Sequence, residues 1–356
     1  MDTEIIKIHP GEGPVSEEDD RKLQAAGEIL KRGGLVAFPT ETVYGLGGDA
    51  LNPTSSQKIY AAKGRPSDNP LIVHIYRFED IEKITSKVPE EAKKIADAFW
   101  PGPLTMILPK SDAVPRETTG GLDTVAIRMP SHPAAQRLIK YSGGYIAAPS
   151  ANTSGKPSPT VAKYVVEDMM GRIDAIIDGG EVGIGLESTI IDLTESKPMV
   201  LRPGYITPQM LSEVLGEEVI IDPGIIAADD TRKPKAPGMK YKHYAPKADM
   251  VIVDGPSDAV VSKINALAHQ KQENGQKVAV IATEESGPSY HADVILSMGS
   301  RLDEDAIAQH LYRILRECDE LHVDAIYSES FQTPRIGQAI MNRLLKAAGH
   351  TVIHCN

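Results

Sequence analysis

Short apolar runs alternate with longer segments of helical spacing along the whole chain. This alternation is typical of α/β layers rather than of an all-helical or an all-β protein. A helix is predicted over 17–32, where apolar residues recur at helical spacing. Another is predicted over 53–63, because the glycine and proline that follow would end it. The apolar runs of the first part predict strands over 35–38, 71–75, 124–127 and 188–191.

A second α/β pattern begins near residue 248. Its runs are apolar on both faces and are separated by helices, which is typical of a small, largely parallel, doubly wound sheet of buried strands. Strands are predicted over 250–253, 277–281, 293–296 and 324–327, and helices over 258–272, 303–318 and 336–348. The chain is therefore expected to form domains over 1–224 and 248–356.

The segment 225–247 between these domains has no clear period and contains several prolines. From Arg232 to Lys247 it carries six lysines and arginines and no acidic residue. A structureless stretch longer than about 12 residues is usually either a linker or functional. Because this segment is basic in an otherwise acidic protein, we expect it to have a function in addition to that of a linker.

Composition narrows the class of protein. The chain has 356 residues, 41% of them apolar and 24% charged, as expected for a soluble globular protein. With 38 Lys and Arg against 49 Asp and Glu, the net charge of -11 argues against binding nucleic acid by bulk attraction. Two cysteines are too few for a zinc cluster or a disulfide framework. Neither a membrane span nor a secretory signal is evident, so a cytoplasmic protein without membrane contact is expected.

Familiar nucleotide signatures are absent or weak. No G-x-x-x-x-G-K-[ST] motif occurs, which excludes a Walker-type ATPase. The run 45–50 fits the relaxed dinucleotide pattern G-x-G-x-x-A, but the stretch 40–44 separates it from the preceding strand. A dinucleotide-dependent enzyme using Gly45 and Gly47 is therefore a minor alternative.

Two loops are better candidates for holding phosphate. Lys63 and Arg65 flank a glycine, so an ammonium and a guanidinium can turn to one side of the loop and meet a polyphosphate. The run 147–158 is rich in small hydroxyl and amide side chains, whose backbone N–H groups could hold an anion. Each loop taken alone is more often an ordinary surface turn than a phosphate site. The runs 183–189 and 202–204 allow the same two interpretations.

Neither a Ser-His-Asp arrangement nor a nucleophilic cysteine stands out. The chemistry indicated is positioning and charge stabilisation rather than covalent catalysis. His74 lies on a strand that looks buried, just beyond the Lys63 loop, and an ordinary core histidine is the alternative interpretation.

Taken together, the motifs closely resemble the two-domain threonylcarbamoyl-AMP synthase family, a YrdC-type domain with a C-terminal extension. The family pattern K-x-R…S-x-N is found as Lys63-Gly64-Arg65 and Ser150-Ala151-Asn152. Further matches follow in the same order along most of the chain, at 39–46, 68–74, 124–128, 187–189, 202–204 and 237–246.

The resemblance implies a nucleotidyltransferase that converts L-threonine, bicarbonate or CO2 and ATP to L-threonylcarbamoyladenylate and pyrophosphate. A partner transferase would then modify the tRNA adenosine beside the anticodon, so the synthase needs at most weak tRNA contact. The implied fold is a twisted open α/β sheet of YrdC type followed by a smaller Rossmann-like domain. Mg²⁺ is expected to enter with ATP, and no protein side chain is assigned as its ligand.

Residue roles carry over from the same resemblance. Lys63 and Arg65 would be catalytic, and the linker would act as a lid through Tyr241, His243 and Tyr244. Residues expected at ATP are Lys63, Arg65, Asn69, Thr124, Ser150, Asn152, Ser158 and Arg202. Residues expected at threonine are Thr42, His74, Arg128, Ala148 and Ser188, with Thr40 and Tyr44 as neighbouring candidates. The rival from another class is a tRNA- or nucleotide-binding module without turnover.

Overall fold

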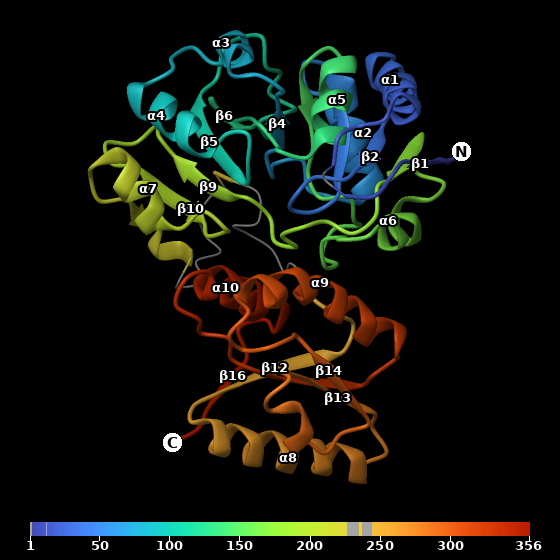
Figure 1. The fold of residues 1–356 in the computed structure, drawn as a ribbon, viewed down its shortest axis with the longest axis vertical. Helices are drawn as coiled ribbons and strands as arrows, with labels where there is room; N and C mark the ends of the chain where they lie inside the picture. Colours follow the sequence, from blue (N-terminus) through green and yellow to red (C-terminus); the bar gives the residue numbers. More distant parts are fainter. Residues whose placement is uncertain (1, 12, 226–234, 237–243) are drawn as a thin grey trace. The chain divides into compact units, whose positions relative to one another are not determined.

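The structure is a computed structural model that describes residues 2–11, 13–225, 235–236 and 244–356. The chain divides into two compact units (Figure 1). The first comprises Met1–Ser154 and Ser158–Tyr241, and the second comprises Gly155–Pro157 and Lys242–Asn356. Each unit has its own sheet.

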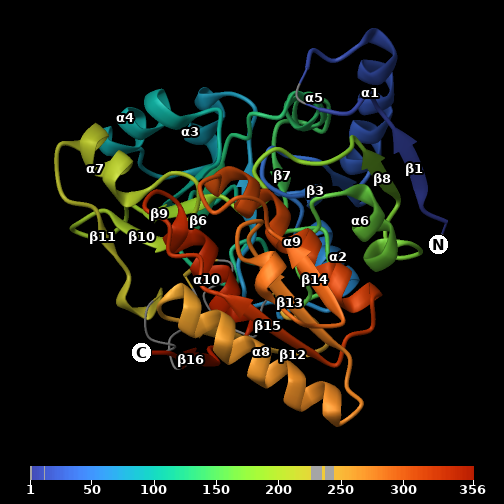
Figure 2. The same cartoon turned by 60° about the horizontal axis from the view of Figure 1, so that its bottom comes forward.

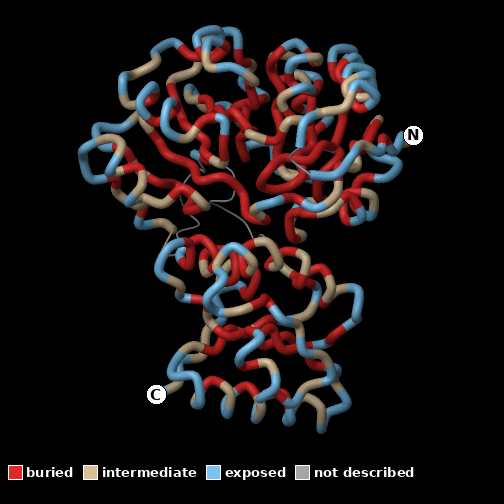
Figure 3. The backbone as a smooth tube through the Cα atoms, in the orientation of Figure 1, coloured by how far each residue is buried: buried red, intermediate tan, exposed pale blue. Residues whose placement is uncertain are grey.

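The first unit is built on a mixed 11-stranded sheet with the order β1-β8-β2-β3-β7-β4-β6-β5-β9-β10-β11. This confirms the expected open α/β sheet. Most of its inner strands are buried along their length (Figure 3). The strands are β1 (Glu4–Lys7), β2 (Val36–Phe38), β3 (Gly45–Asp49), β4 (Ile72–His74), β5 (Leu104–Pro109), β6 (Thr124–Arg128), β7 (Ile146–Ala147), β8 (Ala175–Asp178), β9 (Thr189–Asp192), β10 (Met199–Arg202) and β11 (Ile220–Ile221).

Alternating side chains of these strands pack into separate cores on the two faces of the sheet. The larger core includes side chains from α2, α3, α4, α6 and α7, whereas α1 and α5 pack together on the opposite face. The helices are α1 (Glu17–Lys31), α2 (Pro53–Lys63), α3 (Ile81–Ile84), α4 (Glu90–Phe99), α5 (Pro133–Tyr141), α6 (Ala162–Met169) and α7 (Pro208–Leu215).

The core under α1 and α5 takes its strand residues from β1, β2, β7 and β8. Farther along the same face, a small apolar cluster lies on β4, β5, β6, β9 and β10. Ala236, which belongs to the segment between the predicted domains, is fully buried in this cluster. Part of that segment therefore lies against the sheet face that also carries the polar residues described below.

The second unit has a five-stranded, wholly parallel sheet with the order β14-β13-β15-β12-β16. Helices cover both of its faces, with α8 on one side and α9 and α10 on the other (Figures 1 and 2). This confirms the predicted doubly wound domain. Its elements are β12 (Asp249–Asp254), α8 (Ser257–Glu273), β13 (Val278–Ala282), β14 (Val294–Ser297), α9 (Glu304–Glu320), β15 (Ala325–Glu329), α10 (Gly337–Ala347) and β16 (Val352–His354).

One strand of this sheet corrects the prediction. The run 293–296 was expected to be buried, but β14 is an edge strand whose residues are alternately intermediate and exposed. Ile295 keeps 41% of its surface exposed. An apolar run of three residues, 294–296, does not distinguish a central strand from an edge strand, because both have the same local pattern.

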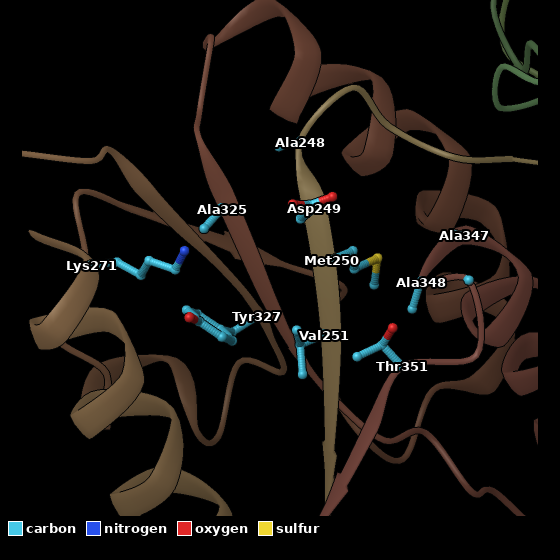
Figure 4. A pocket seen from close by; sticks show the side chains of 11 residues that line it. Ala248, Asp249, Met250, Val251, Lys271, Ala325, Tyr327, Ala347, Ala348 and Thr351 are labelled. Atoms are coloured by element: carbon cyan, nitrogen blue, oxygen red, sulfur yellow. The ribbon is translucent and has the colours of Figure 1, made fainter. Parts of the chain in front are cut away.

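A hollow of about 440 Å³ lies where β12 and β15 begin (Figure 4). Its lining includes Asp249, Lys271, Tyr327 and Thr351. None of the residues predicted to bind ATP or threonine lines it. No helix in the described ranges is long and apolar enough to span a bilayer.

The glycine-rich run 45–50 forms β3 rather than a phosphate-binding turn. This strand lies between β2 and β7 in the sheet. A Cβ atom on Gly47 would come within 2.8 Å of Ile146 Cγ2 and 3.0 Å of Phe38 Cε1. Glycine here permits close packing inside a sheet, which removes the basis of the dinucleotide alternative.

Candidate active site

Polar side chains follow one line across neighbouring strands of the first unit. His74 on β4 pairs with Arg128 on β6, and Arg128 pairs in turn with Thr105 on β5. Thr105 pairs with Ile190 on β9, which pairs with Arg202 on β10. Because directly paired residues project from the same face, this register gathers the predicted threonine-site and ATP-site residues on one side of the sheet.

Arg128 is held by a buried ion pair. Its NH2 group donates to Glu41 Oε1 at 2.7 Å, and its NH1 group donates to Thr42 Oγ1 at 2.9 Å. The side chains of Arg128 and Glu41 are only 5% and 3% exposed. Thr40 Oγ1 lies 2.9 Å from Thr42 Oγ1, so the two threonines predicted here belong to the same network. The guanidinium is fixed in position before any substrate arrives.

His74 is neutral in the folded protein. Burial lowers its pKa to about 3, and the positive charge of Arg128 adds to this shift. His74 Nδ1 lies 3.1 Å from the carbonyl oxygen of Ile72. A carbonyl oxygen only accepts, so Nδ1 carries the proton and Nε2 is the acceptor nitrogen. His74 is thus a polar, uncharged neighbour of Arg128.

This shift predicts a pH-dependent stability. The unfolded chain takes a proton on His74 below about pH 6.5, whereas the folded chain resists protonation down to about pH 3. Stability is therefore fully present above pH 6.5 and falls on acidification, at up to roughly 1.4 kcal/mol per pH unit. Urea denaturation between pH 7.5 and 5 measures this slope. His74→Asn is expected to flatten it, and His269→Asn, on the exposed face of α8, is expected to leave it unchanged.

Lys63 connects the end of α2 to the loop after β7. It is 3% exposed, and its ammonium donates to the carbonyl oxygens of Ser150 and Asn152, the latter at 2.5 Å. Ser150 Oγ in turn donates to Asn152 Oδ1 at 2.5 Å. Two parts of the K-x-R…S-x-N pattern that lie far apart in the sequence are therefore in direct contact.

Arg65 and Asn69 lie in the loop that follows α2. Arg65 Nε donates to the carbonyl oxygen of Asn69 at 3.2 Å, and its NH2 group donates to that of Pro70 at 3.0 Å. Asn69 is 2% exposed, and its Oδ1 atom is buried without a protein partner. Gly64 takes the left-handed conformation that turns the chain out of α2. The loop is thus fixed by its own arginine, while one amide oxygen remains an open acceptor.

A third group centres on Ser188. Arg202 donates from Nε to the Ser188 carbonyl oxygen at 3.0 Å and from NH2 to Ser188 Oγ at 3.1 Å. Thr105 Oγ1 lies 2.8 Å from the same hydroxyl. Ser158 donates to the neighbouring carboxylate of Glu187 at 2.7 Å. Ser188 and Arg202, predicted from separate motifs, are thus hydrogen-bonded to each other, and Ser158 is bonded to Glu187, the residue before Ser188.

The segment 40–44 joins these groups through the backbone. The amide of Gly185 donates to the Thr42 carbonyl oxygen at 3.0 Å, and that of Ala151 donates to the Tyr44 carbonyl oxygen at 2.8 Å. The Tyr44 hydroxyl donates to the Gly180 carbonyl oxygen at 2.7 Å. The loops that carry the predicted ATP and threonine residues are therefore built around one segment.

The remaining predicted residues have varied positions. Thr124 begins β6 on the same face as Arg128, and Ala148 is buried with its amide donating to the Ile72 carbonyl oxygen at 2.9 Å. Tyr244 is buried and packs on Tyr312 of α9, both in the second unit, with ring centroids 5.0 Å apart. Tyr241 and His243 lie outside the described residues, and so does most of the predicted lid.

Three residues of these networks were not predicted: Glu41, Thr105 and Glu187. Glu41 and Glu187 lie inside the quoted motifs, and a carboxylate flanked by small or apolar residues was a signal that could have drawn attention to them. Thr105 is the polar position between Leu104 and Met106 on a buried strand. Its role depends on pairing with Arg128 across the sheet, which the local sequence does not show.

Comparison with known proteins accounts for nearly the whole chain. The telomere recombination family, named Sua5_yciO_yrdC, matches residues 28–204. The C-terminal domain of threonylcarbamoyl-AMP synthase matches residues 206–349. A threonylcarbamoyl-AMP synthase of Pyrococcus abyssi is 51% identical over 336 residues, covering 94% of this chain and 96% of its own. The chain belongs to the threonylcarbamoyl-AMP synthase family.

Other members of this family agree in length and fold. The threonylcarbamoyl-AMP synthase of Bacillus subtilis is 49% identical over 94% of this chain and 95% of its own. A crystal structure of P. abyssi Sua5 complexed with L-threonine superposes with a TM-score of 0.93. That structure is 48% identical and covers 99% of this chain and 100% of its own. The family and fold expected from the motifs are therefore confirmed.

Proposed function

We propose that this chain is a threonylcarbamoyl-AMP synthase, a nucleotidyltransferase that makes L-threonylcarbamoyladenylate for tRNA modification. The observation that carries the proposal is similarity to synthases of this name over both domains and about 94% of the chain. Its substrates are L-threonine, bicarbonate or CO2, and ATP, and pyrophosphate is released. The substrate-site residues below are part of the same proposal.

The threonine part of the site comprises Thr42, His74, Arg128, Ala148 and Ser188. Arg128 faces the substrate carboxylate, and a neutral His74 adds a polar group without competing charge. The neutral amine of threonine adds to CO2 and releases a proton to water, which leaves a carbamate. A carbamate oxygen then attacks the α-phosphorus of ATP. A new oxygen–phosphorus bond forms as the bond to pyrophosphate breaks.

The nucleotide part comprises Lys63, Arg65, Asn69, Thr124, Ser150, Asn152, Ser158 and Arg202. Carbamate, carboxylate and triphosphate bring several negative charges together, so catalysis depends on cations that offset their repulsion. Lys63 and Arg65 are the cations assigned to the phosphates. A buried, preorganised ammonium stabilises developing charge more than a solvated one, because little water screens it.

Mg²⁺ is proposed to enter as the ATP complex. Within the described ranges, no group of three His, Cys, Asp or Glu side chains is arranged to hold a metal ion. Mg²⁺ usually binds substrate phosphates and water together with few protein ligands. The open, buried Asn69 Oδ1 is the protein oxygen that would join them. The ion would neutralise phosphate charge.

The adenylate product would be consumed by a separate transferase that acts on the tRNA adenosine beside the anticodon. The net charge of -11 supports this division of labour, because an acidic synthase need hold tRNA only weakly.

The test is a pyrophosphate-release assay with mass measurement of the product. Release is expected only when ATP, L-threonine and bicarbonate are all present, together with a product of the mass of L-threonylcarbamoyladenylate. The alternative, a binding module without turnover, predicts salt-dependent tRNA affinity and no release under any of these conditions. That second result would refute the proposed function.

A further inference from the structure

Two polar atoms of the Arg128–Glu41 ion pair have no partner. Glu41 Oε2 and Arg128 Nε are both buried without a hydrogen bond. The other atoms of the pair meet at 2.7 Å, so the side chains are ordered and close. A buried polar atom without a partner is destabilising, and more so when it is charged. An unpaired acceptor and an unpaired donor on the two members of one ion pair indicate a ligand that supplies both counterparts.

The open atoms match the two charged groups of an α-amino acid. Arg128 Nε can donate to a carboxylate oxygen, while Glu41 Oε2 can accept only from a donor such as an ammonium group. These two substrate groups are attached to one carbon atom, just as the two open atoms belong to one ion pair. A ligand with a carboxylate but no donor group could pair with Arg128 Nε but not with Glu41 Oε2.

The surroundings of Glu41 favour a cationic ligand group. His74 pairs with Arg128 in the sheet and is neutral because burial and Arg128 lower its pKa. Burial also lowers the pKa of His132, against the opposing influence of the Glu41 carboxylate. The two imidazoles near the ion pair therefore bring no positive charge that would satisfy Glu41 Oε2. A substrate ammonium would supply it.

We propose that Glu41 binds the α-amino group of the substrate, so that Arg128 and Glu41 together recognise the zwitterion. The inference rests on the proposed function for the assignment of the carboxylate to Arg128. It makes Glu41 the residue that selects an amino acid over the corresponding hydroxy acid. It also positions the nitrogen, which forms its bond to CO2 after the ammonium has given a proton to water.

A purely structural role of Glu41 leads to a different result. If Glu41 only orients Arg128, its loss weakens every carboxylate ligand alike, whether or not that ligand has an amine. If Glu41 binds the amine, its loss weakens only the ligands that have one. The ligand that separates these cases is 2,3-dihydroxybutanoate of threonine configuration, which has a hydroxyl group in place of the ammonium.

The experiment is calorimetric titration of the full chain with L-threonine and with this hydroxy acid. The unmodified protein is expected to bind threonine roughly 10–100-fold more tightly, the range for one charged hydrogen bond. Glu41→Gln should lose that factor for threonine and retain its affinity for the hydroxy acid. Equal losses for both ligands would overturn the proposal and show that Glu41 only positions Arg128.

Two controls keep the result interpretable. Glu28→Gln removes one carboxylate from the exposed surface of α1 and should change neither affinity. Thermal unfolding and ATP titration of Glu41→Gln check that the fold and the nucleotide site persist. The unmodified protein provides a test without any variant. If it bound L-threonine and the hydroxy acid equally well, this inference would be overturned. The proposed function would still be supported by pyrophosphate release. Failure of threonine to bind at all would overturn both proposals.

Discussion

Replacing Lys63 by alanine is expected to lower the turnover number of pyrophosphate release by at least about 100-fold. The change removes a buried positive charge from the proposed phosphate site. It also removes the ammonium that ties the Ser150 and Asn152 carbonyl oxygens to the end of α2. Steady-state kinetics with ATP varied at saturating threonine and bicarbonate measure the effect.

Matched variants separate the charge of Lys63 from its anchoring role. Lys63→Gln can still donate to one of the two carbonyl oxygens, so a similar loss of turnover in Lys63→Gln and Lys63→Ala would assign the effect to charge. Lys58, on the exposed side of the same helix, donates to the Gly33 carbonyl oxygen at 2.7 Å. Lys58→Ala should leave turnover unchanged. Normal turnover in Lys63→Ala would show that this lysine is not catalytic.

Replacing Arg128 by alanine is expected to produce the largest change in the threonine requirement, a rise in KM of about 100-fold or more. It should also lower the free energy of unfolding by roughly 3–5 kcal/mol, because Glu41 would be left as an unpaired buried charge. Threonine-dependent kinetics and urea denaturation measure the two effects on one preparation.

The two effects can be separated with a double variant. Arg128→Met combined with Glu41→Gln removes both charges, so it should recover most of the lost stability but none of the threonine binding. Arg116→Ala, which breaks the exposed pair with Asp123, should alter neither quantity by much. If the KM values for ATP and threonine rose by the same factor in Arg128→Ala, the assignment of this arginine to threonine would be wrong.

Much of the fold could be predicted from local sequence. The helix 53–63 was predicted with its observed bounds because a glycine and a proline define its end, and α1 differs from its prediction by one residue. The parallel order of the second sheet followed from strands that are apolar on both faces. By contrast, β3 was mistaken for a possible dinucleotide loop, because the close packing around Gly47 comes from distant residues.

The candidate site was predictable in its parts but not in its connections. Lys63 and Ser150 could be named from a motif, although 87 positions separate them and only the fold brings them into contact. Glu41 was overlooked because its significance lies in a partner, Arg128, that is equally distant in the sequence. Pairings of this kind depend on strand register, which no short window of sequence contains.

The same register determines how the protein tolerates insertions and deletions. Along β6, Arg128 alternates with Ile127, which packs in the larger core on the other side of the sheet. Loss or gain of a single residue just before this strand would exchange the two, placing a guanidinium among apolar helices and an isoleucine at the proposed threonine site. A change of chain length there would thus cost both folding and activity, whereas most single replacements would affect only one of them.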